Sequence, residues 1–504
     1  MLRGGISVSQ LSDFQIDAIA RRVADRLRTT APSAPAAAAA ETSPKAPQLR
    51  PADHESLARG GALPMGVFRS IDECVAAAQA SFIEFAKLGL EKRKVIIAEV
   101  RTSMMAHAIS LARDAHEETG LGRVEDKILK NRLVTRKTPG PEVLEPRAWS
   151  GDDGLTVMER APFGVIASIT PTTNPTSTII CNTIGMISAG NTVVFNVHPN
   201  ARRVSCRNVG LINEAIVRAG GPPNVVTAMA EPTIESAQEL MRHKGIRLLV
   251  VTGGPGVVQA AMASGKRAIC AGPGNPPVVV DETADIERAG RDVVLGASLD
   301  NNVICTDEKE VFVVQSVADR FLKAMEAAGA VVLTKPQTAA IEKIIFEQTR
   351  GPRKPGVTNK KWVGKNANVI LEQIGMRVPD TVRLAVLDVP VEHPLIWTEQ
   401  LMPVLPVARV ANADEAIDLA IAAEHRFGHS ASMHSMHLGR LSRMAREINT
   451  SIFVKNAPIY AGLGEGGEGY SSFSIASPTG EGLTDPRSFS RERRCVLKDH
   501  FRIV

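Results

Sequence analysis

Residues 164–170, "GVIASIT", form a short run of small and branched apolar residues, which is typical of a buried β-strand. Three similar runs follow it: "NTVVFNV" over 191–197, "NVVTAMA" over 224–230 and "IRLLVVT" over 246–252. Between two of them, "SCRNVGLINEAIVRAGG" over 205–221 has a helical pattern and ends in a glycine pair suited to a helix C-cap. Strands that alternate with helices predict a parallel, doubly wound α/β sheet.

A second series of the same kind begins near residue 277. It consists of "PPVVV" over 276–280, a helix expected over 284–298, and "EVFVV" over 310–314. A chain of 504 residues is too long for one ordinary core, so we expect a second α/β domain here. Ahead of both series, Ser70 followed by Glu73 is a capping box that should open a helical region reaching about residue 135.

The composition excludes several classes of protein. The chain is 44% hydrophobic and 22% charged, close to the soluble globular average, and no apolar run approaches the ~20 residues that span a bilayer. The N-terminus lacks the pattern of a secretory signal, so a cytoplasmic protein with no membrane partner is expected. The six cysteines are scattered without CxxC pairs or suitably spaced histidines, so we expect no metal site. The net charge of +5 is modest and no aromatic, basic module accompanies it, so no nucleic-acid partner is expected.

The first 60 residues form a separate piece. "VSQLSDFQIDAIARRVADRLRTT" over 8–30 predicts one amphipathic helix that opens with a capping box of Ser12 and Gln15. An Ala/Pro-rich linker follows over 31–60 and cannot bury a core. The helix can fold back on the main body, lie on a membrane, or dock into a groove on a partner protein. Because the linker is flexible, docking onto a partner protein is favoured over folding back on the main body.

Two connections after predicted strands are suited to ligand binding, because open parallel sheets bind ligands at the carboxyl ends of their strands. "TPTTNPT" over 170–176 follows the first strand and contains Asn174. "TGGPGVV" over 252–258 follows the fourth, and Gly253 and Gly254 leave the start of a helix open to a phosphate. Neither connection is a GxGxxG fingerprint, and a glycine pair before a helix is often only a tight turn.

Cys305 lies on a polar connection in "SLDNNVICTDEKEVFVV" over 298–314. Cysteine is usually a small buried hydrophobe, so on a helix–strand loop it is either incidental or a nucleophile. Four histidines invite a search for a general base: His393, His425, His429 and His434. Their predicted positions on loops and helix ends are typical of surface residues, so we assign that role to none of them.

Taken in order, these features resemble the aldehyde dehydrogenase superfamily: the asparagine loop, the TGG turn, a Gly/Pro segment, the cysteine, and "TEQLMPVLPV" over 398–407. The resemblance runs from about residue 60 to the end. It is strongest to the CoA-acylating propionaldehyde and acetaldehyde dehydrogenases of bacterial microcompartments. Three segments support this: "CAGPGNPPVVVD" over 270–281, "AGLGEGGEGYSSFSIASPTGEGLT" over 461–484 and "RRCVLKDHFRIV" over 493–504.

The resemblance implies a domain plan with two Rossmann-like domains and a small oligomerisation element. A nicotinamide cofactor-binding domain would span 61–276, with a bridging hairpin near 145–162. A catalytic domain carrying Cys305 would span 277–475, and residues 476–504 would return to the cofactor domain or the oligomer interface. Members of the superfamily are dimers or tetramers. Residues 1–30 resemble the targeting helices that bind microcompartment shell proteins, which implies a location inside such a compartment.

The resemblance also assigns site residues. Cys305 would attack the aldehyde, while the Asn174 amide and the Cys305 backbone N–H would stabilise the oxyanion. Glu399 would bind the nicotinamide ribose, unless it is an ordinary surface carboxylate. The other predicted nucleotide contacts are Thr170, Thr172, Thr173, His198, Gly253 and Gly254, although His198 can equally be a packed loop histidine. Asn196 and Pro199 replace the usual ribose-binding lysine and glutamate, so NAD is expected and NADP stays open.

Ala271 occupies the place where hydrolytic relatives have a glutamate that activates water. Alanine cannot accept a proton, whereas a thiol with a pKa of ~8.5 supplies some thiolate at neutral pH, so we expect acyl transfer to coenzyme A. Two alternatives are a hydrolytic aldehyde dehydrogenase with another base and a cargo or scaffold protein without chemistry. A short-chain aldehyde is the expected substrate, and amino- or hydroxy-substituted aldehydes stay open.

Overall fold

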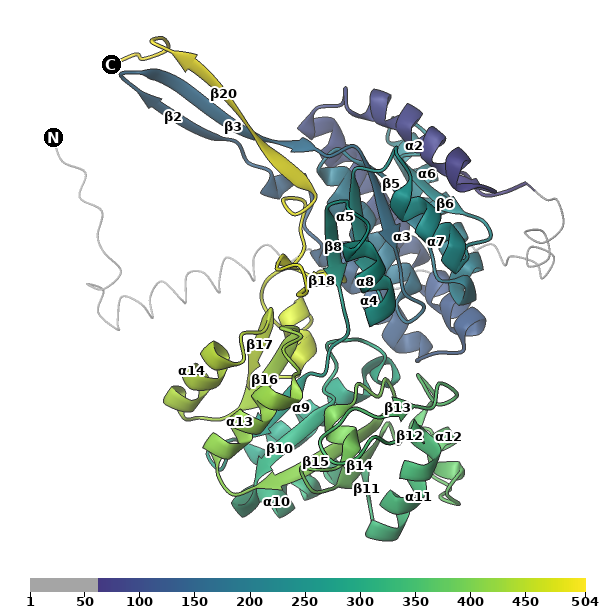
Figure 1. Cartoon of the computed structure of the whole chain (residues 1–504), viewed down its shortest axis with the longest axis vertical. Helices are drawn as coiled ribbons and strands as arrows, with labels where there is room; N and C mark the ends of the chain where they lie inside the picture. Colours follow the sequence, from purple (N-terminus) through teal and green to yellow (C-terminus); the bar gives the residue numbers. More distant parts are fainter. Residues whose placement is uncertain (1–61) are drawn as a thin grey trace, which may run out of the picture. The chain divides into compact units, whose positions relative to one another are not determined.

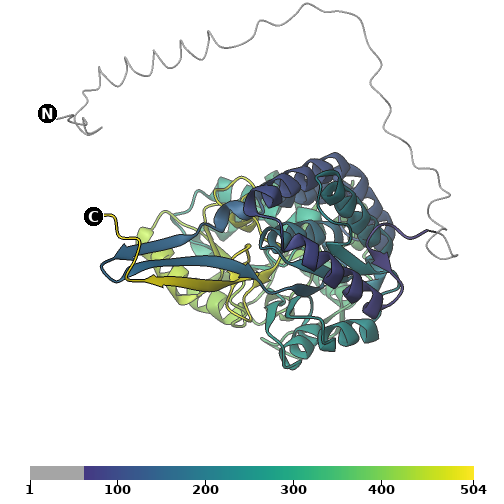
Figure 2. The ribbon, with the colours of Figure 1, turned by 90° about the horizontal axis from the view of Figure 1, so that it is seen from above.

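The computed structural model describes residues 62–504, which form one unit (Figure 1). The helix predicted over 8–30 and the linker predicted over 31–60 lie outside the described residues. Two parallel sheets organise the unit, and Figure 2 shows the same ribbon from above. The predicted α/β architecture with parallel sheets is confirmed.

The first sheet has six strands, all parallel. In spatial order they are β1 (Val67–Phe68), β6 (Val226–Met229), β5 (Thr192–Asn196), β4 (Val165–Ile169), β7 (Leu248–Thr252) and β8 (Ala268–Ala271). The central strands β4 and β5 are buried at every position, as in a sheet with helices on both faces. That burial explains why "GVIASIT" is continuously apolar apart from Ser168 and Thr170.

Helices cover both faces of this sheet (Figure 1). One face packs against α5 (Pro175–Ser188) and α6 (Arg202–Arg218), which are covered in turn by α3 (Leu90–Thr119) and α4 (Val124–Lys137). The other packs against α2 (Ile71–Phe85), α7 (Ile234–Arg242) and α8 (Pro255–Met262). The predicted capping box opens α2, because the Ser70 hydroxyl accepts from the Glu73 amide at 3.2 Å and the Glu73 carboxylate accepts from the Ser70 amide at 3.0 Å.

The second sheet has seven parallel strands. Their order is β11 (Ala330–Leu333), β14 (Leu384–Asp388), β15 (Val404–Val410), β10 (Glu310–Val314), β9 (Pro277–Val280), β16 (Ser430–His434) and β17 (Ile452–Lys455). One face packs on α9 (Ile286–Ser298) and α10 (Gln315–Ala327). The other packs on α11 (Lys335–Ile345), α12 (Ala367–Glu372), α13 (Ala413–Ala423) and α14 (Leu438–Glu447).

A third, antiparallel sheet joins distant parts of the chain. Strands β2 (Arg147–Gly151) and β3 (Gly154–Pro162) form a hairpin, and the late strand β20 (Ser490–Lys498) pairs with β3 along its whole length (Figures 1 and 2). Short elements complete the unit: η3 (Pro141–Val143), η4 (Pro199–Ala201), η5 (Leu299–Asn302), η6 (Pro394–Trp397), η7 (Ile459–Leu463), β12 (Phe346–Gln348), β13 (Val357–Thr358), β18 (Ile475–Ala476) and β19 (Gly482–Leu483).

Helix α3 has the length and apolar content of a membrane span, which the sequence interpretation did not detect. It is a core helix instead. Ile96, Val100, Met104 and Leu111 are buried along one side of α3 and belong to the core of the first sheet. The apolar composition of α3 is therefore accounted for by packing inside the protein.

Candidate active site

One large cavity, of about 920 Å³, collects every site residue predicted from the sequence. Its lining includes Thr170, Thr172, Thr173, Asn174, His198, Gly253, Gly254, Cys305 and Glu399. Most of these residues follow β4, β5 and β7, so they lie at the carboxyl edge of the first sheet, where a parallel sheet binds ligands. Cys305 and Glu399 reach the same cavity from the second sheet.

Cys305 follows a sharply strained turn. Asp300, Asn301 and Asn302 have φ angles of 46°, 57° and 65°, three consecutive residues in the left-handed region. Aspartate and asparagine adopt this conformation more readily than other non-glycine residues, because their short polar side chains bond locally. The turn explains why the sequence reads "DNN" just before the cysteine. Each such residue costs on the order of 1–3 kcal/mol, so surrounding contacts must hold it.

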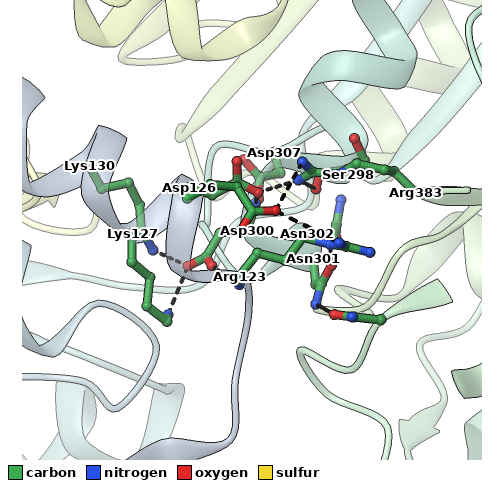
Figure 3. Close-up of polar contacts among 12 residues, drawn as sticks. Arg123, Asp126, Lys127, Lys130, Ser298, Asp300, Asn301, Asn302, Asp307 and Arg383 are labelled. Atoms are coloured by element: carbon green, nitrogen blue, oxygen red, sulfur yellow. Dashed lines mark hydrogen bonds and ion pairs between the residues drawn. The ribbon is translucent and has the colours of Figure 1, made fainter. Parts of the chain in front are cut away.

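Buried hydrogen bonds hold the turn from both sides (Figure 3). The Asp300 carboxylate accepts from the Arg123 amide at 2.7 Å, and the Asn301 oxygen accepts from the Arg123 guanidinium at 3.2 Å. Asn302 donates to the carbonyls of Ala297 at 2.8 Å and Glu308 at 2.9 Å. Arg123 belongs to the first sheet's lobe, so the turn is fixed by residues outside its own loop.

The charged run after the cysteine is buried, although its sequence is that of a polar loop. Asp307, Glu308, Lys309 and Glu310 are each at most 1% exposed. The Lys309 ammonium donates to the carbonyls of Asn302 at 2.8 Å and Ile304 at 3.1 Å, and it thereby ties the two sides of the cysteine loop together. Burial raises the pKa of Glu308 to about 8 and raises the pKa values of Asp307 and Glu310 well above their usual range. Burial therefore shifts the equilibrium of all three acids toward the protonated, neutral form.

The Cys305 thiol is half-buried at the cavity wall. Burial, followed by the negative charge of Glu399, raises its pKa to about 12, while the Lys309 ammonium acts in the opposite direction. The thiol is therefore protonated at neutral pH in the ligand-free protein. Formation of a thiolate requires a change in this environment or transfer of the proton as the substrate is attacked.

Asn174 is the N-cap residue of α5 and lines the cavity. Its side-chain oxygen accepts from the Lys130 ammonium at 2.6 Å, and its amide nitrogen donates to the Thr173 hydroxyl at 3.2 Å. The oxygen is thus turned toward α4. The amide N–H group is the end that remains for a ligand, as an oxyanion donor requires.

Glu399 is a partly buried cavity residue, so the interpretation as an ordinary surface carboxylate is wrong. Its carboxylate accepts from the Gly274 amide at 3.2 Å, which fixes its position beside the segment 272–274. Burial raises the pKa of Glu399 and the Lys309 ammonium lowers it, with burial the larger effect.

The other end of the cavity fits a nicotinamide dinucleotide. Helix α8 begins there, and a Cβ added to Gly254 would meet nothing within 4 Å, so a phosphate can approach the first amides of the helix. The buried hydroxyls of Thr170 and Thr172 have no partner among residues 62–504 and can bind polar ligand atoms. His198 lines the cavity, but its Nδ1 accepts from the Asn200 amide at 3.2 Å, and burial lowers its pKa. It is therefore a neutral histidine that also packs its own loop.

Ala271 ends β8 and is buried, with no carboxylate in its place. The side chain of its neighbour Cys270 is buried in the core between the first sheet, α2, α7 and α8. Burial raises the pKa of Cys270 to about 11, so it is an inert core thiol.

The expectation that all four candidate histidines are surface residues is wrong for two of them. His429 and His434 are 1% and 2% exposed, because β16 places them inside the second lobe. Burial lowers the pKa of His429 to about 3, so its ring is neutral. Its Nε2 has no partner among the described residues, and both its ring and the Cys305 carbonyl lie near Gly274.

The sequence interpretation missed the cluster of α4 residues behind Asn174. Lys127 and Lys130 are each 2% exposed, and both form ion pairs with Asp300, which is fully buried (Figure 3). In "VEDKILKN" these lysines are spaced three apart and have the pattern of a solvated helix face, so nothing in the sequence signals their burial. Phe473 and Ile475 of the glycine-rich late segment also line the cavity and were given no role.

A family model described as the aldehyde dehydrogenase family covers residues 39–484, so the chain belongs to the aldehyde dehydrogenase family. Its relatives include CoA-acylating enzymes. The acetylating acetaldehyde dehydrogenase EutE of Salmonella typhimurium is 50% identical over 87% of this chain and 94% of its own length. The CoA-propanoylating propanal dehydrogenase of the same organism is 44% identical over 87% of this chain and 93% of its own.

Solved structures that are similar to this chain include further aldehyde dehydrogenases of the CoA-acylating branch. The propionaldehyde dehydrogenase of Rhodopseudomonas palustris, with bound CoA and an acylated cysteine, has a TM-score of 0.83 and 46% identity over 86% of this chain and 98% of that chain. The propionaldehyde dehydrogenase from the fucose utilisation bacterial microcompartment of Clostridium phytofermentans has a TM-score of 0.84 and 46% identity over 87% and 100% of the two chains. The predicted resemblance to the CoA-acylating branch is confirmed.

Proposed function

We propose that this chain is a CoA-acylating aldehyde dehydrogenase that oxidises a short-chain aldehyde with NAD and passes the acyl group from Cys305 to coenzyme A. The observation that carries the proposal is the presence of Cys305 and Asn174 on one cavity. The absence of a carboxylate at Ala271 supports CoA over water as the final acceptor. The CoA-acylating relatives, which match nearly their whole length, support the same activity.

In the first step the Cys305 sulfur bonds to the aldehyde carbon, and the thiol proton passes to water. The aldehyde oxygen becomes an oxyanion, which accepts hydrogen bonds from the Asn174 amide and the Cys305 backbone N–H. When bound, the nicotinamide supplies a hydride acceptor, and Glu399 is suited to hold its ribose through hydrogen bonds. Loss of the hydride leaves a thioester on Cys305.

In the second step the thiol of CoA attacks the thioester carbonyl, and the same two donors stabilise the second oxyanion. The bond between the acyl carbon and Cys305 breaks, acyl-CoA departs, and the Cys305 sulfur recovers a proton. Reduced cofactor leaves before CoA enters, so the kinetics should be ping-pong. Thr170, Thr172, Thr173, His198, Gly253 and Gly254 are the proposed nucleotide contacts.

A product assay tests this function. Propanal and NAD are supplied with and without CoA, and NADH, acyl-CoA and free acid are measured, with NADP in a parallel series. We expect NADH formation that depends strictly on CoA, with acyl-CoA as the product, and no activity in Cys305→Ala. Free acid formed without CoA would instead support the hydrolytic alternative, and a wild-type protein with no activity would support a scaffold.

We also propose that residues 1–60 target the enzyme to a microcompartment shell protein. The support is the amphipathic pattern over 8–30, the Ala/Pro-rich linker, and a relative that comes from a microcompartment. Deletion of residues 1–50 should leave the activity of the purified enzyme intact and abolish its co-sedimentation with shells. Unchanged encapsulation of the truncated protein would refute the targeting role.

The three-stranded sheet is proposed to join subunits into a dimer or tetramer. Trp149 on β2 and Val496 on β20 are 49% and 60% exposed, which favours their burial against a second subunit. Substitution of both by Lys should shift the mass measured by light scattering toward that of the monomer, about 54 kDa. An unchanged mass would refute this interface.

A further inference from the structure

Two buried lysines on α4 stand behind the oxyanion donor, and the mechanism described above uses neither of them. Lys127 and Lys130 are one helical turn apart, both 2% exposed, and both donate to the same Asp300 oxygen (Figure 3). Only Lys130 also reaches the cavity wall, where its ammonium donates to the Asn174 side-chain oxygen at 2.6 Å. The pair is therefore alike in burial and in ion pairing but different in contact with the site.

The contact fixes which end of the Asn174 amide faces the ligand. An ammonium group has three donors and no acceptor, so only the amide oxygen can face Lys130. The amide nitrogen must then face away from α4, where one hydrogen is accepted by the Thr173 hydroxyl. Without a cation at this position, rotation of the side-chain amide would present oxygen to the cavity, and oxygen repels an oxyanion.

Both lysines also support the turn before Cys305, because both bind the Asp300 carboxylate. Asp300 opens the left-handed turn that leads to Cys305, whose backbone N–H is the second oxyanion donor. Burial raises the pKa of Asp300, but the charges of Lys127 and Lys130 outweigh burial, so its net pKa lies below its usual value and it remains a carboxylate. Asp126 accepts from the Asp300 amide at 2.8 Å and pairs with Arg383, so the turn is anchored on both sides.

From this geometry we infer that Lys130 is a positioning residue for acyl transfer: its ammonium holds the Asn174 side-chain oxygen, so that the amide N–H faces the oxyanion formed at Cys305. The inference rests on the proposed function, because it concerns the oxyanion formed at Cys305. A charge beside the amide oxygen also polarises the amide and strengthens its N–H as a donor. Lys127 holds Asp300 but touches neither donor, so it is a stability residue.

Lys130→Met and Lys127→Met form a matched pair for the test. Both variants remove a buried cation from Asp300, so both should lower the thermal unfolding midpoint to a similar extent. Loss of an oxyanion donor lowers turnover by ~10²–10³-fold, and we expect Lys130→Met to lose ~10²-fold in kcat with KM for NAD changed less than threefold. Lys127→Met should keep kcat within about threefold of wild type.

A double-variant comparison separates positioning from a general structural defect. If Lys130 acts through Asn174, then Asn174→Ala with Lys130→Met should be no slower than Asn174→Ala alone, whereas Lys127→Met should add its own small effect independently. If either methionine variant fails to fold, Lys130→Gln and Lys127→Gln replace the pair. In that pair Lys130→Gln should still lose more kcat than Lys127→Gln, because only Lys130 contacts the Asn174 oxygen and a neutral amide holds it less firmly than an ammonium does.

Equal losses of kcat in the Lys127 and Lys130 variants, or additive losses with Asn174→Ala, would overturn the inference while leaving the proposed function intact. The product assay on the wild-type enzyme separates this outcome from failure of the proposed function, because the wild-type enzyme would then form no acyl-CoA. A loss in Lys130→Met confined to KM would also overturn the inference, since an oxyanion donor acts on turnover.

Discussion

The thiol of Cys305 should react slowly with an alkylating reagent at neutral pH, and its rate should keep rising as the solution becomes alkaline. Burial and the Glu399 carboxylate raise the pKa of Cys305 to about 12. An ordinary thiol has a pKa of ~8.5, so a shift of ~3.5 units lowers the thiolate fraction at pH 7 by ~3,000-fold. A more basic thiolate is intrinsically more reactive by ~40-fold, which leaves alkylation ~100-fold slower than that of a simple thiol.

The assay uses a Cys495→Ser background, because Cys495 is exposed while the other four cysteines are buried. Iodoacetamide is added from about pH 6 to about pH 10, and the modified Cys305 peptide is quantified by mass spectrometry. Because the thiolate is the reactive form, the rate should rise about tenfold per pH unit without a plateau in this range. Glutathione under the same conditions serves as the simple thiol.

Glu399→Gln tests the cause of the shift. Removal of a negative charge beside the thiol lowers the pKa of Cys305, so alkylation at pH 7 should become faster. Glu424→Gln is the control, since Glu424 is also a buried carboxyl but is not among the groups that shift the pKa of Cys305. A plateau below about pH 8, or slower alkylation in Glu399→Gln, would refute the account of a protonated resting thiol.

Gly254→Val should raise KM for NAD about tenfold or more, because the added side chain would occupy the space from which a phosphate approaches α8. The unfolding midpoint should not change, since Gly254 has an ordinary φ of −67° and open space around it. Gly89→Val is the kinetic control, because Gly89 is equally open but lies outside the cavity. Burial raises the pKa of Glu308 to about 8 against ~4.3 unfolded, so stability falls as pH rises between these values. Glu308→Gln should make that fall shallower and gain ~2 kcal/mol or more at pH 8 in chemical denaturation. A wild-type curve that is flat with pH would contradict this. Asn302→Ala should cost ~2–4 kcal/mol, because it removes three buried hydrogen bonds at φ 65°, whereas Asn224→Ala at φ 61° should cost only ~1 kcal/mol. Equal losses of stability would show that backbone strain alone decides.

Much of the fold could be predicted from local patterns. The capping box at Ser70 sets the start of α2, and the apolar runs such as 164–170 became buried parallel strands because hydrophobicity and strand period are properties of neighbouring residues. All nine predicted site residues line the cavity. Seven of them follow strands of the first sheet, whose carboxyl-end loops meet at one edge, whereas Cys305 and Glu399 come from loops that precede β10 and β15. The resemblance supplied the roles, which spacing alone does not contain.

The failures share a physical cause. Whether a charged residue is buried depends on what packs against it, and its partner is usually distant in the chain. Lys130 and Asp300 are 170 positions apart, and the late segment containing Phe473 reaches the cavity from the other end of the chain. His429 and His434 looked like surface residues because only the completed second sheet encloses them.

The sequence by itself determined the parallel α/β sheets and the family, and it placed Cys305 and Ala271 at the positions on which the proposed chemistry rests, because each depends on residue type and order. Only the tertiary structure decided that the "DNN" turn is left-handed, that the charges from Asp307 to Glu310 are buried, and that the resting thiol is protonated. Burial removes water from ionisable groups and makes their few neighbours decisive. Only the folded structure brings Lys130 into contact with Asn174, which lies 44 positions away in the chain.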